Sequence, residues 1–272
     1  MERYHSSNPS FSPAQQRYLR SHRRHHHCIS IARFVLLALF LLVWESAAQL
    51  GYIDRFFFSS PSAILLYLYE MFCSHAFFVH TGITLAETVV SFLLVTICSL
   101  LLATLLWYQK SLSEILEPYL VVLNSLPKSA LAPLLIVWLG TGTGTIIVAG
   151  ISVAVFGSII SLYTGFCQAD PEMLRLIYTL GGNRRDAFRK VILPSSIPLI
   201  LSNMKINIGL SLVGVIIGEF LAARRGLGYL IIYGSQVFQL NMVITSILIL
   251  CGIAMIFYKL IQSLEHFYRK KV

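Results

Sequence analysis

The sequence predicts an all-α integral membrane protein with about six transmembrane helices. Of its 272 residues, 56% are hydrophobic and only 12% are charged, whereas soluble domains carry about 25% charged residues. Six apolar segments are each long enough to cross a hydrocarbon core, which takes about 20 residues of helix. The net charge of +9 comes from basic residues near the ends of these segments rather than from one continuous stripe. This distribution favours a membrane topology signal over nucleic-acid binding.

The first predicted span lies at about 29–50 and follows a polar tail at 1–28, which we expect to be mostly disordered. Its apolar run is longer than the core of a cleavable signal peptide, which measures about 7–15 residues, so we expect a retained helix. The other five spans are predicted at about 82–108, 119–139, 145–166, 197–221 and 243–267. Pro127 and Pro133 lie inside the third of these and predict a kink.

The segment at about 61–76, between the first two spans, is apolar and aromatic but too short to cross a bilayer. We interpret it as an amphipathic helix lying on the outer face of the membrane. A loop with buried aromatic side chains is an alternative that fits the sequence equally well.

The positions of lysine and arginine predict the topology. With the N-terminus inside, the outer segments contain only Arg55, Arg224 and Arg225, whereas the inner segments contain most of the remaining basic residues, including the basic tail at 269–272. Cytoplasmic loops of membrane proteins carry an excess of lysine and arginine. We therefore expect a multi-pass protein of the cytoplasmic membrane with both termini in the cytoplasm.

A polar segment at 167–194, here called the elbow, separates the fourth and fifth predicted spans. Its first half begins with Asp170 and Pro171, a pair typical of a helix N-terminus. Gly181 or Gly182 can end this helix in a left-handed conformation that other residues resist. The first half of the elbow is therefore predicted to be a short helix that stops at a sharp bend.

The second half of the elbow predicts another short helix, capped by Asn183 and stopped by Leu193-Pro194 before the fifth span. One face of this helix is apolar. The opposite face carries Arg185, Asp186, Arg189 and Lys190. This amphipathic pattern favours packing against protein, although a helix pair lying on anionic lipid is an alternative.

The elbow resembles the EAA loop of ABC importer permeases, whose pattern is E-A-A-x-x-x-G, nine residues and I-x-L-P. Here Gly181 is followed by nine residues and then by Val191-Ile192-Leu193-Pro194. The glycine and the Leu-Pro pair match the pattern. Arg175-Leu176-Ile177 stand where the family has its E-A-A triplet.

Two further motifs resemble the nitrate/sulfonate/taurine branch of these permeases. Residues 127–140 match its P-x-x-A-x-x-P-L…W-x-G segment, and Glu219 followed by Gly226-Leu227-Gly228 is also typical of the branch. The resemblance covers most of the chain and implies a permease domain at 81–268, after a region at 29–80 that holds the first span and the outer-face segment.

The resemblance implies a type I ABC importer transmembrane domain with a cytoplasmic coupling helix in the elbow. Such a permease works with a second copy of itself, with two cytoplasmic ABC ATPase subunits and with an extracytoplasmic solute-binding protein. This chain has no Walker A lysine motif, so we expect no enzyme activity and no cofactor on it, and ATP to be used by the partner subunit. The coupling residues implied are Asp170, Arg175, Gly181, Arg185, Asp186, Leu193 and Pro194.

Polar residues within the predicted spans are candidates for the substrate path, because charged residues at a helix centre cost about 2.5–3.5 kcal/mol to insert and usually face protein or water. The candidates are Asn124, Pro127, Lys128, Lys205, Asn207 and Glu219. Lys128 and Lys205 are suited to attract a small anion such as a sulfonate or nitrate. Alternatively, each lysine extends to a membrane interface, and Glu219 forms an outer-face salt bridge with Arg224 or Arg225 or helps to dock the binding protein.

Two other functions stay open at this point. One is a secondary transporter driven by an ion gradient, and the other is uptake of a vitamin or pyrimidine precursor by the same ABC mechanism. The five cysteines are scattered, and no spacing among them predicts a disulfide framework or a metal site.

Overall fold

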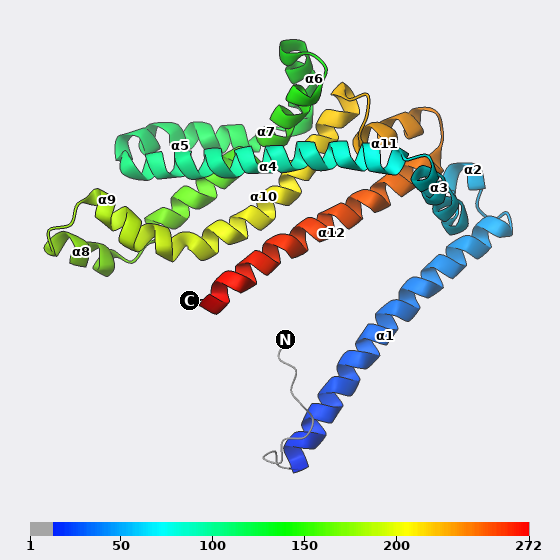
Figure 1. Cartoon of the computed structure of the whole chain (residues 1–272), viewed down its shortest axis with the longest axis horizontal. Helices are drawn as coiled ribbons and strands as arrows, with labels where there is room; N and C mark the ends of the chain where they lie inside the picture. The colour runs from blue at the N-terminus through cyan, green and yellow to red at the C-terminus, as the bar shows by residue number, and fades with distance from the viewer. Residues whose placement is uncertain (1–12, 272) are drawn as a thin grey trace. The chain divides into compact units, whose positions relative to one another are not determined.

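The computed structural model describes residues 13–271, which form helices joined by short connections and contain no strand (Figure 1). The chain divides into two compact units, residues 1–63 and 64–272. Within the described part, five helices are long and apolar enough to cross a membrane, and one bent helix pair can supply a sixth span. The predicted fold class, an all-α membrane protein with about six spans, is confirmed.

The first unit contains α1 (Pro13–Gln49) and the short α2 (Arg55–Phe58). The apolar part of α1, Ile31–Gln49, is the first candidate span. The predicted disorder of the tail was wrong from Pro13 onward, and residues 1–12 lie outside the described part of the chain. Residues 14–28 contain no glycine or proline, so nothing in them opposes extension of the helix.

The segment predicted at 61–76 forms α3 (Pro61–Cys73), so the helical interpretation is confirmed and the loop alternative was wrong. Ser62 lies in the first turn of α3. Its backbone N–H and its hydroxyl both donate to the Glu45 carboxylate, at 3.0 and 2.8 Å. A carboxylate near a helix N-terminus is favourable because it accepts from free N–H groups and complements the helix dipole.

Three long helices form the core of the second unit: α4 (Ala76–Tyr108), α7 (Thr143–Cys167) and α10 (Leu193–Ala222). α7 packs against both of the others. A Cβ added at Gly214 would lie 2.7 Å from the Gly150 Cα, so the two helix backbones approach as closely as small residues allow. Gly214 and Gly218 of α10 therefore form a small-residue face that packs against α7.

The third predicted span is broken into α5 (Lys110–Ser125) and α6 (Lys128–Leu139), which meet at 97°. The predicted kink is confirmed, and the bent pair begins at Lys110, earlier than the span predicted at 119–139. Leu126 and Pro127 have extended backbones, with ψ of 138° and 105°. A residue before proline is pushed out of the helical region, and proline offers no N–H to continue the hydrogen-bond ladder.

A helix that the sequence analysis did not predict, α11 (Leu227–Gln236), precedes the last helix, α12 (Leu240–Lys271). With ten residues, α11 is too short to span a bilayer, and it lies between the fifth and sixth predicted spans. It packs mainly against α12 and α10.

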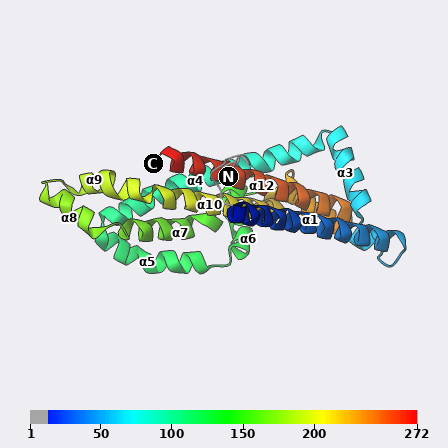
Figure 2. The same ribbon diagram turned by 90° about the horizontal axis from the view of Figure 1, so that it is seen from below.

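The second unit has two distinct ends. α8 (Pro171–Thr179) and α9 (Arg184–Ala187) lie beyond one end of the α4–α7–α10 layer, and α3 lies at the opposite end in both views (Figures 1 and 2). α11 lies at that opposite end as well, and α12 runs from there toward the elbow (Figure 1). The C-terminus of the described helix and the elbow are therefore on the same side of this unit.

Candidate functional site

The first half of the elbow is built by local hydrogen bonds. Asp170 caps α8, because its Oδ1 accepts from the Glu172 backbone N–H at 2.9 Å, with Pro171 in the first turn. After α8 the chain turns at Gly181, whose φ is +81°, and the Gly182 N–H donates back to the Ile177 carbonyl at 2.9 Å. This end of α8 is the left-handed stop that the sequence predicts.

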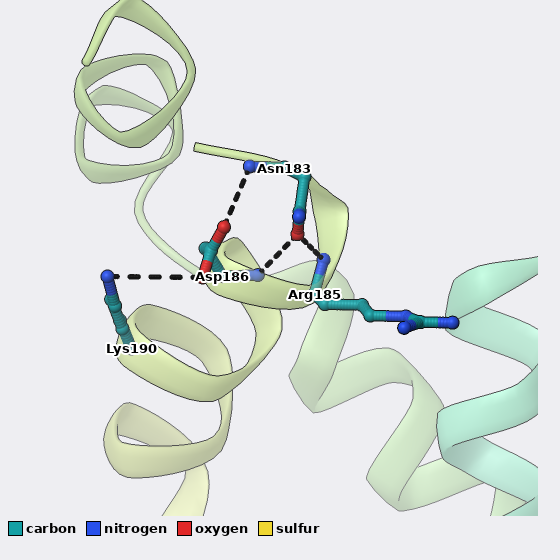
Figure 3. Close-up of polar contacts among 4 residues, drawn as sticks. All are labelled: Asn183, Arg185, Asp186 and Lys190. Carbon is teal, nitrogen blue, oxygen red and sulfur yellow. Dashed lines mark hydrogen bonds and ion pairs between the residues drawn. The ribbon is translucent and has the colours of Figure 1, made fainter. Parts of the chain in front are cut away.

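A capping box starts the second half of the elbow (Figure 3). The Asn183 Oδ1 accepts from the backbone N–H groups of Arg185 (2.9 Å) and Asp186 (3.0 Å), and the Asp186 carboxylate accepts from the Asn183 N–H at 3.0 Å. Two free N–H groups at the start of the helix and one before it are satisfied in this way. Lys190 lies 3.9 Å from the Asp186 carboxylate and is exposed.

The helix does not stop at Leu193-Pro194, so that prediction was wrong. α9 continues through a π-helical turn, Phe188–Ile192, directly into α10. In this turn the Leu193 N–H donates to the Phe188 carbonyl, five residues back. The wider turn shifts the hydrogen-bond register just before Pro194, which has no N–H to donate, so the helix passes the proline instead of ending there.

The elbow is fixed to the bundle by an arginine and an aromatic cluster that sequence reasoning missed. The Arg184 guanidinium donates to the Trp107 carbonyl at 2.8 Å and lies 5.0 Å above the centre of the Trp107 ring. Phe188 is buried and lies 5.4 Å from the rings of both Trp107 and Tyr108 and 5.7 Å from that of Phe166. We call these contacts the clasp, since they join α9 to the ends of α4 and α7.

The two elbow helices are amphipathic as predicted, and the structure shows what each face does. Ala187 and Ile192 are fully buried, and Leu174 of α8 packs against the same cluster. The other side of the elbow is exposed and carries both basic and apolar side chains. The exposed apolar side chains are Met173, Leu176, Tyr178 and Leu180, with 49–75% of their surface accessible. An exposed apolar patch with a basic surround is typical of a protein-binding surface.

The predicted coupling residues all lie in this region. Asp170, Gly181 and Asp186 shape the backbone through the contacts above, and Leu193 and Pro194 follow the π-helical turn. Arg175 and Arg185 are exposed, and Figure 3 shows the Arg185 side chain pointing away from the capping box.

The substrate-path candidates fall into three separate places. In the middle of the bundle, Asn203 and Asn207 of α10 are buried and donate to the Ser158 hydroxyl of α7, at 3.0 and 2.9 Å. The neighbouring residue, Gly157, faces Asn124 of α5, whose Oδ1 would lie 3.1 Å from an added Cβ. Asn124 and Asn207 therefore flank the same turn of α7 from two sides.

Lys128 and Pro127 lie at the break between α5 and α6, next to this polar group. The Lys128 ammonium donates to the Leu123 carbonyl and lies 5.2 Å from the centre of the Phe156 ring. Phe156 directly precedes Gly157 in α7. Asn124, Lys128 and Asn207 thus gather around one segment of α7, residues 156–158.

Lys205 and Glu219 lie elsewhere on α10, fourteen positions and about 21 Å of helix apart. The Lys205 ammonium forms an ion pair with Glu265 of α12. Glu219 is fully buried at the end of the bundle opposite the elbow, and no ion pair between it and Arg224 or Arg225 occurs in the described chain.

Glu219 holds together three helices. Its carboxylate accepts from the Thr84 hydroxyl of α4 at 2.7 Å and from the Gly228 N–H of α11 at 2.5 Å. The Leu227 N–H donates to the same Thr84 hydroxyl at 2.9 Å, and the Gly226 N–H donates to His80 Nδ1 at 3.0 Å. We call this group the Glu219 knot. It explains the spacing between Glu219 and Gly226-Leu227-Gly228, because a Cβ at Gly226 or Gly228 would meet the carboxylate at 2.4–2.7 Å.

Comparison with known proteins identifies the family of this chain. Residues 95–270 match the family described as the binding-protein-dependent transport system inner membrane component. The chain belongs to this family. It is an ABC importer permease, as its elbow indicated, and members of this family are membrane components rather than enzymes.

Individual relatives agree with this assignment. A Haemophilus influenzae protein named as an ABC transporter permease is 30% identical over 85% of this permease and 94% of its own length. A formylaminopyrimidine transport permease of Halalkalibacterium halodurans is 27% identical over 70% of this chain and 76% of its own. An aliphatic sulfonates transport permease of Bacillus subtilis is 26% identical over 85% and 86%.

A solved structure shows the same fold. The methionine ABC transporter MetNI, in an inward-facing conformation, contains a chain that matches with a TM-score of 0.60 at 18% identity, over 69% of this permease and 93% of that chain. The predicted architecture, an ABC importer transmembrane domain, is therefore confirmed.

Proposed function

We propose that this permease is the transmembrane subunit of an ATP-driven importer and that its elbow receives the movement of separate ATPase subunits. The observation that carries the proposal is the exposed side of the elbow, where apolar side chains of α8 stand beside basic ones. Exposed apolar surface rimmed by polar residues is typical of protein–protein or membrane interaction sites. The clasp gives movement at this surface a direct route to α4 and α7.

The chain works as one of two copies, with both termini in the cytoplasm and a solute-binding protein at the outer face. The C-terminal end of α12 and the elbow lie on the same side of the second unit (Figure 1), which agrees with the charge asymmetry of the sequence. The Glu219 knot and α11 then lie on the side of the binding protein. Alternating access requires the two copies to move relative to each other as largely rigid bundles.

A crosslinking experiment tests this proposal. Leu180, directly after α8, is the most exposed apolar residue of the elbow, at 75%. A photo-reactive amino acid at position 180 is therefore expected to join the permease to the ATPase subunit in the assembled transporter. The same probe at Val89, an exposed residue within the α4 span, serves as the control. Absence of an ATPase adduct from position 180 in a transport-competent complex would contradict the proposal.

The substrate is a small anion, and Lys128 is the residue that attracts it. Its ammonium stands at the α5–α6 break beside Asn124, whose amide can donate a hydrogen bond to an oxyanion, and the aliphatic sulfonates permease is among the relatives. Lys205 is less suited to this role, because its charge is already balanced by Glu265.

A vitamin or pyrimidine precursor is the second candidate substrate, favoured by the similarity to the formylaminopyrimidine permease. The two substrate classes are separated by the ligand of the partner binding protein. Calorimetric titration of that protein with a sulfonate and with a pyrimidine decides between them. Binding of neutral ligands alone would remove the basis for an anionic substrate.

A further inference from the structure

Two adjoining cavities lie between α10 and α12 in the half of the bundle nearer the elbow. The first, about 380 Å³, has walls that are apolar except where two lysines border it. Its apolar lining consists mainly of Ile208, Gly209, Leu212, Ala254, Met255 and Phe257. The second, about 420 Å³, lies toward the end of α12 and is lined by Gln262, Ser263, Glu265 and His266. Lys259 borders both cavities, so together they form one slot that is apolar at one end and polar at the other.

The polar end of the slot has an excess of positive charge. Lys259 and His266 line it together with the single carboxylate of Glu265, and Lys205 lines the adjoining apolar cavity next to Lys259. Lys205 is paired with Glu265, whereas Lys259 forms no ion pair with any residue whose side chain the structure describes. The exposed Lys259 ammonium, which borders both the apolar and the polar cavity, is thus left without a counter-charge, which favours binding of an anion.

The apolar end of the slot is open because of Gly209. A Cβ placed there would meet no atom within 4 Å, so this stretch of α10 leaves room beside Leu212 and Met255. A hydrated inorganic anion would gain nothing from these walls, since polar groups lose free energy where no hydrogen bond replaces water. An amphipathic anion matches both ends, with its charged group at the lysines and its chain beside Gly209.

The slot is oriented like a lipid of the inner leaflet, with its polar end at the headgroup level and its apolar end toward the membrane interior. Its polar end points toward the C-terminal end of α12, and its apolar end points toward the middle of α10 and α12. Given cytoplasmic termini, the polar end lies at the inner headgroup level. Basic pockets between helices at this level are suited to bind anionic lipid headgroups.

We propose that the slot binds an anionic phospholipid of the inner leaflet. Its phosphate lies between Lys205 and Lys259, and one acyl chain follows the apolar walls past Gly209. The bound lipid fills the space between α10 and α12 and braces them against each other. The proposal rests on the orientation given above but not on the substrate or on ATP coupling, so the lipid assay below can fail while those proposals stand.

Native mass spectrometry of the permease complex tests the charge requirement. The complex is purified in detergent and titrated with phosphatidylglycerol or with phosphatidylcholine of the same chain length. We expect at least tenfold stronger retention of phosphatidylglycerol, and Lys259→Gln to weaken it about fivefold while phosphatidylcholine is unaffected. Lys110→Gln is the matched control, because that lysine is exposed at the start of α5 and lies outside the slot. Equal retention of the two lipids would overturn the proposal.

Filling the slot tests its shape. Gly209→Leu places a side chain in open space, so we expect the fold to persist and lipid retention to fall about tenfold or more. Gly82→Leu is the control, since this α4 glycine also has open space around it but lies outside the slot. Wild-type retention by both Gly209→Leu and Lys259→Gln would refute lipid binding here. A photo-reactive amino acid at position 209 that joins two permease chains, rather than a lipid, would show that a second copy fills the slot and would equally overturn the proposal.

Discussion

The elbow and the Glu219 knot lie at opposite ends of the same helices and are held in different ways. In the elbow, most hydrogen bonds join residues within five positions of each other, such as those of the Asn183 capping box. In the knot, the bonds from Thr84 to Glu219 and from Gly226 to His80 join residues 135 and 146 positions apart. The first end is assembled locally, whereas the second exists only when three helices have come together.

This difference agrees with the role that we propose for the elbow. A unit held by local bonds keeps its own shape when it moves, so the elbow can be displaced as one piece by a partner. A unit held by bonds between α4, α10 and α11 resists any relative movement of these helices. We therefore expect substitutions in the knot to lower the stability of the bundle and substitutions in the elbow to alter its coupling to the ATPase subunits.

The largest expected effect is at the knot. Glu219→Ala leaves the Gly228 N–H buried without its acceptor and leaves the Thr84 hydroxyl only the His80 carbonyl at 3.2 Å. We expect a loss of about 3 kcal/mol in the free energy of unfolding. Glu219→Gln keeps an acceptor of the same shape and should lose less than half as much. Thermal unfolding of the purified permease in detergent measures both. An unfolding midpoint of Glu219→Ala equal to that of wild type would show that the knot is not a stabilising element.

A smaller loss of stability, with a larger effect on transport, is expected at the elbow bend. Gly181→Val puts a β-branched side chain at φ +81°, which costs about 1–2 kcal/mol in backbone strain although the space is open. We expect normal insertion but at least tenfold slower ATP-driven uptake into proteoliposomes, because α8 changes direction. Gly82→Val, in an open part of α4 with an ordinary helical φ, is the control. Wild-type uptake by Gly181→Val at equal expression would show that the bend at Gly181 is not required for coupling.

The smallest effect is expected at the clasp, which joins the elbow to the bundle. Arg184→Lys keeps the charge but loses the planar contact with the Trp107 ring and the geometry of its hydrogen bond, at a cost of about 1 kcal/mol. We expect uptake per ATP hydrolysed to fall a few-fold while ATPase activity of the complex persists. The exposed Arg224, changed to Lys, controls for the substitution itself in unfolding measurements. Unchanged coupling would mean that force enters the bundle through the π-helical turn and α10 alone.

Sequence alone determined the features that depend on near neighbours. The spans follow from runs of apolar residues, and the caps at Asp170 and Asn183 and the stop at Gly181 follow from side chains that bond within a few positions. Pro127 predicted the break in the third span but not its 97° angle. A proline disfavours the helical conformation of the residue before it without fixing which other backbone conformation that residue adopts.

Only the tertiary structure decided the rest. Leu193-Pro194 is typical of a helix end, but the helix passes it by way of a π-helical turn whose Phe188 and Ile192 are buried in the bundle. Glu219 reads as a surface charge or a substrate contact, yet it is the buried acceptor that joins α4 to α11. Lys205 meets Glu265 across 60 positions. These contacts join residues far apart in the sequence and form only when whole helices pack together. No local sequence pattern therefore predicts them.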